Sequence, residues 1–118
     1  MRLPSLLVLL LAAGCVGPPA PDADLCRDLV TRLCLVPRCG QVDSQLAVSD
    51  DCEATLLTRT GCGSDDFTFS EPSRTRVLEC RMPLIRVSTS HAVSPGCDNV
   101  AEVFTNCPDL VRFLGGTP

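Results

Sequence analysis

The sequence predicts a small, mainly α-helical domain held together by disulfide bonds, and three observations support this fold class. Apolar residues recur at helical spacing in short stretches that end at proline or glycine. Aromatic residues are scarce, with four Phe and no Trp or Tyr, so a core of this size buries little apolar area. Nine cysteines in 118 residues compensate, because each disulfide bridge stabilises by roughly 2–4 kcal/mol. We expect four or five short helices and at most one short extended segment.

One of the nine cysteines stands apart from the others. Cys15 lies at the end of an apolar leader, whereas the remaining eight are spread through the body of the chain. Eight cysteines in an exported domain predict four bridges, although they allow on the order of a hundred connectivities. The cysteines expected in disulfide bonds are Cys26, Cys34, Cys39, Cys52, Cys62, Cys80, Cys97 and Cys107.

The first helix is expected over residues 25–34, between an aspartate N-cap at position 22 or 24 and Pro37. Its apolar face includes Cys26 and Cys34, which would lie ~12 Å apart along a continuous helix. These two cysteines therefore cannot bond to each other and should bridge to other elements. The apolar face is formed by Leu25, Cys26, Leu29, Val30, Leu33 and Cys34.

A second helix is expected after residues 49–51, where a serine and two aspartates favour a helix N-terminus. Gly61 is its expected stop, and residues 41–48 before it fit neither a helix nor a strand pattern. The buried face of this helix would be formed by Cys52, Leu56 and Leu57.

A third helix is expected to open at residues 70–72 and to end at Pro83. Residues 67–69 before it alternate as a short extended piece, and residues 84–87 after it fit a brief strand or an extended connector. The buried face of this helix would be formed by Val77, Leu78 and Met82.

The C-terminal part predicts two further helical stretches. One begins after residues 94–96 and places Cys97, Val100, Ala101, Phe104 and Cys107 at helical spacing. The other begins at Pro108, closes at Gly115 and Gly116, and carries Leu110, Val111, Phe113 and Leu114.

Residues 1–14 have the pattern of an export signal. Arg2 gives a positive start, and an apolar run follows it. The run is far shorter than the ~20 residues that cross a bilayer as a helix, and it ends in small residues that suit cleavage.

The leader ends in Leu11-Ala12-Ala13-Gly14-Cys15, which resembles the lipobox of a bacterial lipoprotein precursor. The resemblance implies that the cysteine carries diacylglycerol, that the leader is cut before it, and that the new N-terminus is acylated and held by the membrane. It also implies the outer membrane, because the next residue is not the aspartate that favours inner-membrane retention in some bacteria. An ordinary secretory signal would be cut at the same bond, so a secreted protein without lipid is an alternative.

The predicted layout has three parts: a signal peptide at residues 1–14, the lipidated Cys15 with a proline-rich tether at 15–23, and a cysteine-rich domain at 24–118. Proline-rich segments stay extended, which suits a tether. Without the leader the chain has nine arginines, no lysine and fourteen acidic residues, a net charge of −5. This charge, with arginines scattered along the sequence, predicts no binding to nucleic acid.

Residues able to carry catalysis or to hold a metal are few. His91 is the single histidine, and neither a nucleophile nor an orienting group can be placed beside it. The sequence has no Cys-x-x-Cys pair for thiol redox chemistry or zinc. Asp50-Asp51 and Asp65-Asp66 lack the spaced oxygen ligands of a calcium loop and are expected in caps and turns. We therefore predict no enzyme activity, no cofactor and no metal.

The leading interpretation is a structural or interaction module that presents a rigid domain to a protein or surface partner. A carrier of a lipid or a small apolar ligand, somewhat similar to saposins, is the alternative and would need a hollow core. The spacing within Cys52/Cys62 and within Cys97/Cys107 is faintly similar to that of twin CX9C hairpins, in which antiparallel helices are joined across the two pairs.

Overall fold

The computed structural model of the chain describes residues 21–35, 39–48, 50–85 and 95–116, with the side chain of Gln41 excepted. These residues form six α-helices and one short 3-10 helix, and none of them is in a strand. The mainly α, disulfide-rich fold predicted from the sequence is therefore confirmed. In chain order the elements are α1 Pro21–Leu35, α2 Gly40–Leu46, α3 Cys52–Thr60, α4 Arg74–Cys80, η2 Met82–Ile85, α5 Cys97–Asn106 and α6 Pro108–Leu114.

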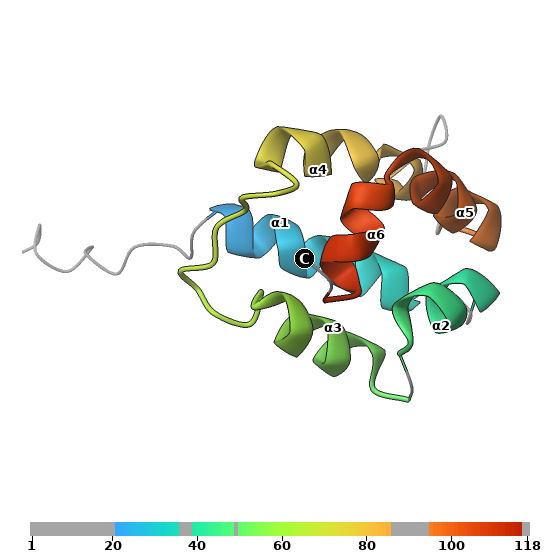
Figure 1. The fold of residues 1–118 in the computed structure, drawn as a ribbon, viewed down its shortest axis with the longest axis horizontal. Helices are drawn as coiled ribbons and strands as arrows, with labels where there is room; N and C mark the ends of the chain where they lie inside the picture. The colour runs from blue at the N-terminus through green and yellow to red at the C-terminus, as the bar shows by residue number, and fades with distance from the viewer. Residues whose placement is uncertain (1–20, 36–38, 49, 86–94, 117–118) are drawn as a thin grey trace, which may run out of the picture.

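Helix α1 crosses the middle of the domain, with α4 on one side of it and α3 on the other (Figure 1). Helix α6 packs against α3, α5 and α2, and α5 packs against η2. The side chains that meet between these helices form one continuous core of leucines and valines. Its fully buried members include Leu29, Val30, Leu56, Val77, Leu84, Val100, Leu110 and Leu114.

Helix α1 begins at Pro21, so residues 21–23, predicted to belong to the tether, form its first turn. Proline suits the first position of a helix because its missing N–H would have no partner there, and Ala23 is fully buried. The predicted apolar face is confirmed in Leu25, Cys26, Leu29, Val30 and Leu33, which are all buried, while Cys34 is half-buried.

The other helix boundaries follow local signals. Gly61 ends α3 with φ +86°, and its N–H donates to the Leu57 carbonyl, as expected for a glycine stop. Ser73 caps α4, since its hydroxyl accepts from the Arg76 N–H at 3.2 Å. The predicted C-terminal helices are confirmed as α5 and α6, and α6 has Pro108 at its first position.

The segment around Pro83 corrects two expectations. Helix α4 ends at Cys80, because Pro83 has no N–H to donate to the carbonyl of residue 79. The chain then turns as η2, which buries Leu84 and leaves Met82 57% exposed instead of on the buried face. Leu84 and Ile85 therefore lie in a helical turn and not in a strand or an extended connector; residues 86 and 87 are outside the described residues.

Residues 41–48 fitted no sequence pattern, and the structure places most of them in α2, where Val42 and Leu46 are buried one turn apart. Residues 67–69 keep the alternation predicted for a short extended piece, since Phe67 and Phe69 are half-buried and Thr68 is exposed; they form no sheet with the other described residues.

The eight cysteines of the body form four disulfide bridges, with Cα–Cα distances of 5.5–6.1 Å. Two nested bridges tie α1 to α3 and to the residue that follows Gly61, and one bridge ties α4 to the junction of α5 and α6. The fourth, Cys39–Cys97, alone among the four joins the first three helices to the last three. No bridge joins Cys52 or Cys62 to Cys97 or Cys107, so the likeness to twin CX9C hairpins is wrong. The bridges are Cys26–Cys62, Cys34–Cys52, Cys39–Cys97 and Cys80–Cys107.

The loop lengths predict how much each bridge contributes. Cys39–Cys97 closes 58 residues and Cys34–Cys52 closes 18. Replacing both cysteines of the longer bridge by alanine should lower the free energy of unfolding by about 1 kcal/mol more than the same change in the shorter one, because the unfolded chain gains more freedom. Guanidinium titration of the two double variants, each with its other three bridges verified by mass, measures the difference. An equal or larger loss at Cys34–Cys52 would contradict this account.

Candidate functional site

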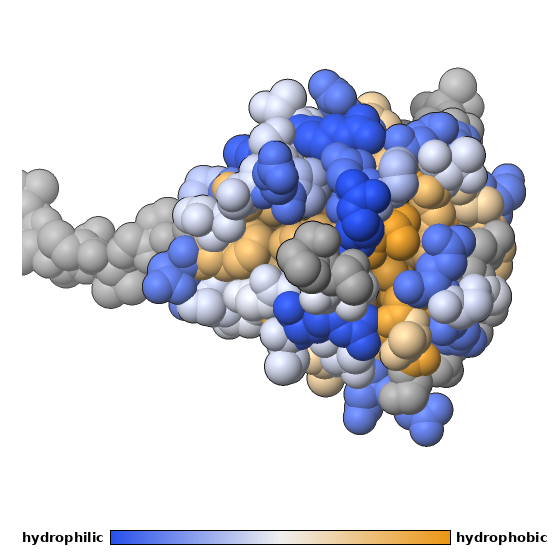
Figure 2. Space-filling view, viewed as in Figure 1, coloured by the Kyte–Doolittle hydropathy of each residue, from blue (hydrophilic) through white to orange (hydrophobic). Residues whose placement is uncertain are grey.

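The fold brings three arginines from distant parts of the sequence to one open groove of about 1020 Å³. Arg59 comes from α3, Arg76 from α4 and Arg112 from α6. The side of the molecule shown in Figure 2 has hydrophilic side chains over α4 and over α3, with an apolar surface between them. We call this hollow the arginine groove; its lining also includes Thr60, Ser70, Glu71, Pro72, Ser73, Asp109, Phe113 and Gly116.

Arg59 occupies a position where two helices end. Its guanidinium donates to the carbonyls of Leu46 and Ala47 at the end of α2 and to that of Leu114 at the end of α6. The last carbonyls of a helix have no partner within the helix and carry the negative end of its dipole. Arg59 therefore caps both helices and ties them to α3.

Gly116 makes room for Arg59. Its φ of +77° lies in the left-handed region, and a Cβ at this position would lie 2.7 Å from Arg59 Cγ. A side chain here would strain the backbone and displace the arginine. Glycine therefore lets the turn after α6 close over the Arg59 stem.

Arg76 and Asp109 form another part of the wall of the arginine groove. Arg76 Nε and Nη2 donate to the two oxygens of Asp109 at 3.0 and 3.1 Å, and Nη2 also donates to the Asn106 carbonyl. These hydrogen bonds lower the pKa of Asp109 and raise the pKa of Arg76 from their ordinary values. The pair fixes α4 to α6 and keeps the Asp109 charge neutralised.

Three of the four phenylalanines gather beside this wall. The ring centroids of Phe67, Phe69 and Phe113 lie 4.9–6.1 Å apart, and the first two rings meet edge to face. Phe113 lines the groove directly. The arginines thus border a surface that is partly aromatic.

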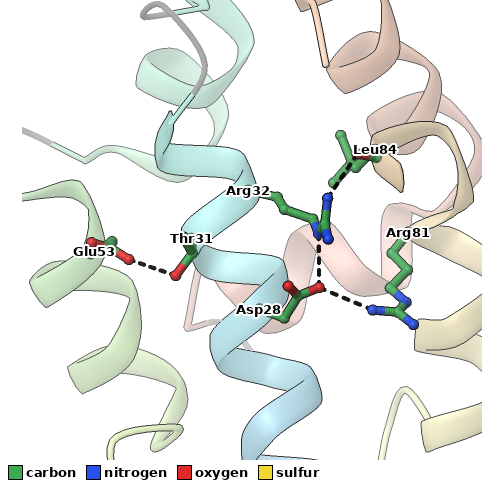
Figure 3. Close-up of polar contacts among 6 residues, drawn as sticks. All are labelled: Asp28, Thr31, Arg32, Glu53, Arg81 and Leu84. Carbon is green, nitrogen blue, oxygen red and sulfur yellow. Dashed lines mark hydrogen bonds and ion pairs between the residues drawn. The ribbon is translucent and has the colours of Figure 1, made fainter. Parts of the chain in front are cut away.

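Other arginine–carboxylate contacts lie away from the groove, around α1. Asp28 on α1 accepts from Arg32 of the same helix at 2.9 Å and from Arg81 after α4 at 3.0 Å (Figure 3). On the other side of α1, the Thr31 hydroxyl donates to Glu53 of α3 at 2.7 Å. These contacts hold α1 to both of its neighbours.

Asp22 makes a similar connection at the start of α1. Its two oxygens accept from the Phe69 backbone N–H and from Arg74, each at 2.9 Å. The N–H of Phe69 and then the Arg74 guanidinium lower the pKa of this carboxyl below its usual value of 3.8. Asp22 thus joins α1 to the segment that precedes α4.

Two residues singled out in the sequence, Cys15 and His91, lie outside the described residues. Local structure places three of the four paired aspartates, while Asp50 is exposed in the bend before α3. Asp51 occupies the N-cap position of α3, although its side chain makes no capping hydrogen bond. Asp65 forms an ion pair with Arg27, and Asp66 accepts from the Ser64 hydroxyl in the same turn.

One group of side chains has metal-ligand spacing. The sulfur atoms of Cys80 and Cys107 and a carboxylate oxygen of Asp109 lie within 4.8 Å of one another. Both sulfur atoms belong to a disulfide bridge, and a metal needs the thiolate. While the bridge is closed, this group cannot act as a metal site.

The chain matches no family model, no curated protein and no solved structure. Among the residues that the structure describes, no helix is both long enough and apolar enough to span a membrane. The description of the site therefore rests on its own geometry, whose main feature is the arginine groove. Sequence reasoning missed this groove because its arginines carry no shared motif and meet only through the packing of α3, α4 and α6.

The double cap predicts a large effect for one groove arginine on stability. Arg59→Leu keeps an apolar stem but leaves the final carbonyls of α2 and α6 without their donor, so the free energy of unfolding should fall by about 1–3 kcal/mol. Thr58→Ser, at an exposed position of the same helix, should change it by less than about 0.5 kcal/mol. Urea titration compares the two, and equal losses would show that Arg59 is not a cap.

The Asp22 contacts predict a pH-dependent contribution to stability. Because the folded-state pKa is lowered, the contribution is present above pH 3.8 and is lost as the pH falls through the lowered value. Asp22→Asn should therefore lower the urea midpoint at neutral pH and lower it less at about pH 2. Asp24→Asn, an exposed change in the same first turn, is the control. A loss at Asp22 of the same size at both pH values would rule out the ionic contacts as its cause.

Proposed function

We propose that this protein is a lipid-anchored, disulfide-stapled module of a bacterial cell envelope that presents a rigid domain to a protein partner. The observation that carries the proposal is the complete pairing of the eight body cysteines. It leaves Cys15 as the one cysteine of the sequence outside the four bridges. Disulfide bonds persist in oxidising compartments, which agrees with the export signal before Cys15.

The lipobox-like end of the leader supplies the anchor in this proposal. One acyl chain holds a protein only marginally, whereas two or three attached to Cys15 would hold it durably. A fully extended chain from Cys15 to Pro21 would reach about 19 Å at ~3.1 Å per residue. The start of α1 would then lie close to the membrane, which we propose to be the outer membrane.

The described domain favours a surface interaction over carriage of an apolar ligand. A carrier needs an enclosed apolar cavity, but the grooves around α4 are open and each has both arginine and carboxylate side chains in its lining. Helices joined by four bridges and by arginine contacts also keep a fixed shape. A fixed surface lowers the entropy lost when a partner binds.

Intact mass of the membrane-extracted protein, with and without reduction, tests the proposal. We expect a chain that begins at Cys15, is heavier by its acyl groups, and gains eight hydrogens when four bridges are reduced. A Cys15→Ser variant, which cannot be lipidated, should lose the added acyl mass and leave the membrane fraction. An unmodified N-terminus at Cys15 would overturn the anchor, and eight free thiols in native protein would overturn the stapled domain.

A further inference from the structure

We propose that Cys97 is a thiol-exchange site, at which the thiolate of a low-molecular-weight thiol opens the Cys39–Cys97 bridge. The thiolate attacks Cys97 Sγ and forms a mixed disulfide there, while the bond between the two cysteines breaks and Cys39 leaves as a thiolate. The attacking sulfur is oxidised and Cys39 is reduced, so the step balances without another reactant. This inference goes beyond the proposed function and does not depend on the lipid anchor.

Cys97 is the most accessible of the bridged cysteines. It is the one exposed residue among the eight, all of which lie in the described part of the chain. Five of the others are buried, and Cys34 and Cys52 are half-buried. Its partner Cys39 is only 2% exposed. Exchange depends on access to the sulfur that is attacked, so an external thiolate reaches this bridge from the side of Cys97.

The position of Cys97 in its helix favours the second half of the exchange. It is the first residue of α5, a helix of ten residues. The free N–H groups and the dipole at a helix N-terminus stabilise a thiolate, although the exposed Asp98 beside it offsets part of this effect. A stabilised thiolate leaves more readily when a second thiol attacks the mixed disulfide. Cys52 has the same position in α3 but is less exposed.

Opening this bridge would change the domain more than opening any other. The remaining three bridges each lie within the first three helices or within the last three. Without Cys39–Cys97, helix α2 still packs against α5 and α6, and Arg59 of α3 still donates to the Leu114 carbonyl (Figure 1). The two halves would therefore stay in contact but would no longer be covalently joined. An external thiol would loosen the link between them while each half keeps its own bridges.

Partial reduction of the mature protein with dithiothreitol, after any free Cys15 thiol has been blocked, tests the order in which the bridges open. Trapping with N-ethylmaleimide and peptide mapping by mass should find Cys39 and Cys97 labelled first, while the other three bridges are intact. Earlier opening of Cys34–Cys52 or of a buried bridge, or simultaneous opening of all four, would overturn the proposal.

Two matched variants test which sulfur is attacked. Cys39→Ala leaves Cys97 as a free thiol, and Cys97→Ala leaves Cys39 free; both lose the same bridge, and both also carry Cys15→Ser so that no other free thiol reacts. Intact mass confirms the remaining three bridges in each. The uncharged reagent dithiodipyridine should react about tenfold faster with Cys97 than with Cys39, because Cys97 is exposed at a helix N-terminus. Equal rates, or a faster reaction at Cys39, would show that Cys97 is not the exchange site.

Discussion

Two nested disulfide bridges hold α1 against α3, and the rest of the domain is assembled around that pair. Cys26–Cys62 fixes the first half of α1, and Cys34–Cys52 fixes its end. Between them Leu29 and Leu33 are buried in a core of leucines and valines, while three of the four phenylalanines sit half-buried at its edge. A core of medium-sized side chains gains little apolar burial per residue, so the covalent closure supplies much of what large rings supply elsewhere.

Arginine is the second means by which the helices are joined. The chain has no lysine, and its guanidinium groups reach across helix boundaries to carbonyls and carboxylates. Exposed ion pairs contribute little to stability one at a time. Arg59 differs from the others because its partners are carbonyls at two helix ends, which have no other donor within their helices. The same residue type thus ties the domain together and gives one face of it a positive groove.

Much of the fold could be predicted from the sequence because its longer helices have clear periods and clear ends. The apolar face of α1, the stop at Gly61 and the proline start of α6 are all local signals. Helix α2 could not be predicted, because seven residues with buried Val42 and Leu46 have too weak a pattern. Its ends are held by distant residues: Cys39 before it bonds to Cys97, and Arg59 caps its last carbonyls.

The disulfide pairing and the candidate site depend on packing in the same way. The sequence predicts that the eight cysteines pair and that Cys26 cannot reach Cys34, but the choice among the remaining partners is made by the way helices pack. Arg59, Arg76 and Arg112 likewise share no spacing or motif and become neighbours only when α3, α4 and α6 meet. Cys15 lies outside the described residues, and its proposed lipidation is supported by the pattern of the leader sequence.

The long Cys39–Cys97 bridge also has a consequence for the order in which the protein matures. Bridges over shorter loops close at a smaller entropic cost, so the α1–α3 pair and the unit of α4, α5 and α6 can each oxidise on its own. The two halves must then dock before residues 39 and 97 come within bonding distance, so this bridge is expected to form last. Its closure would convert two separately oxidised halves into one domain, and a thiol exchange catalyst would act chiefly on wrong pairings made before that step.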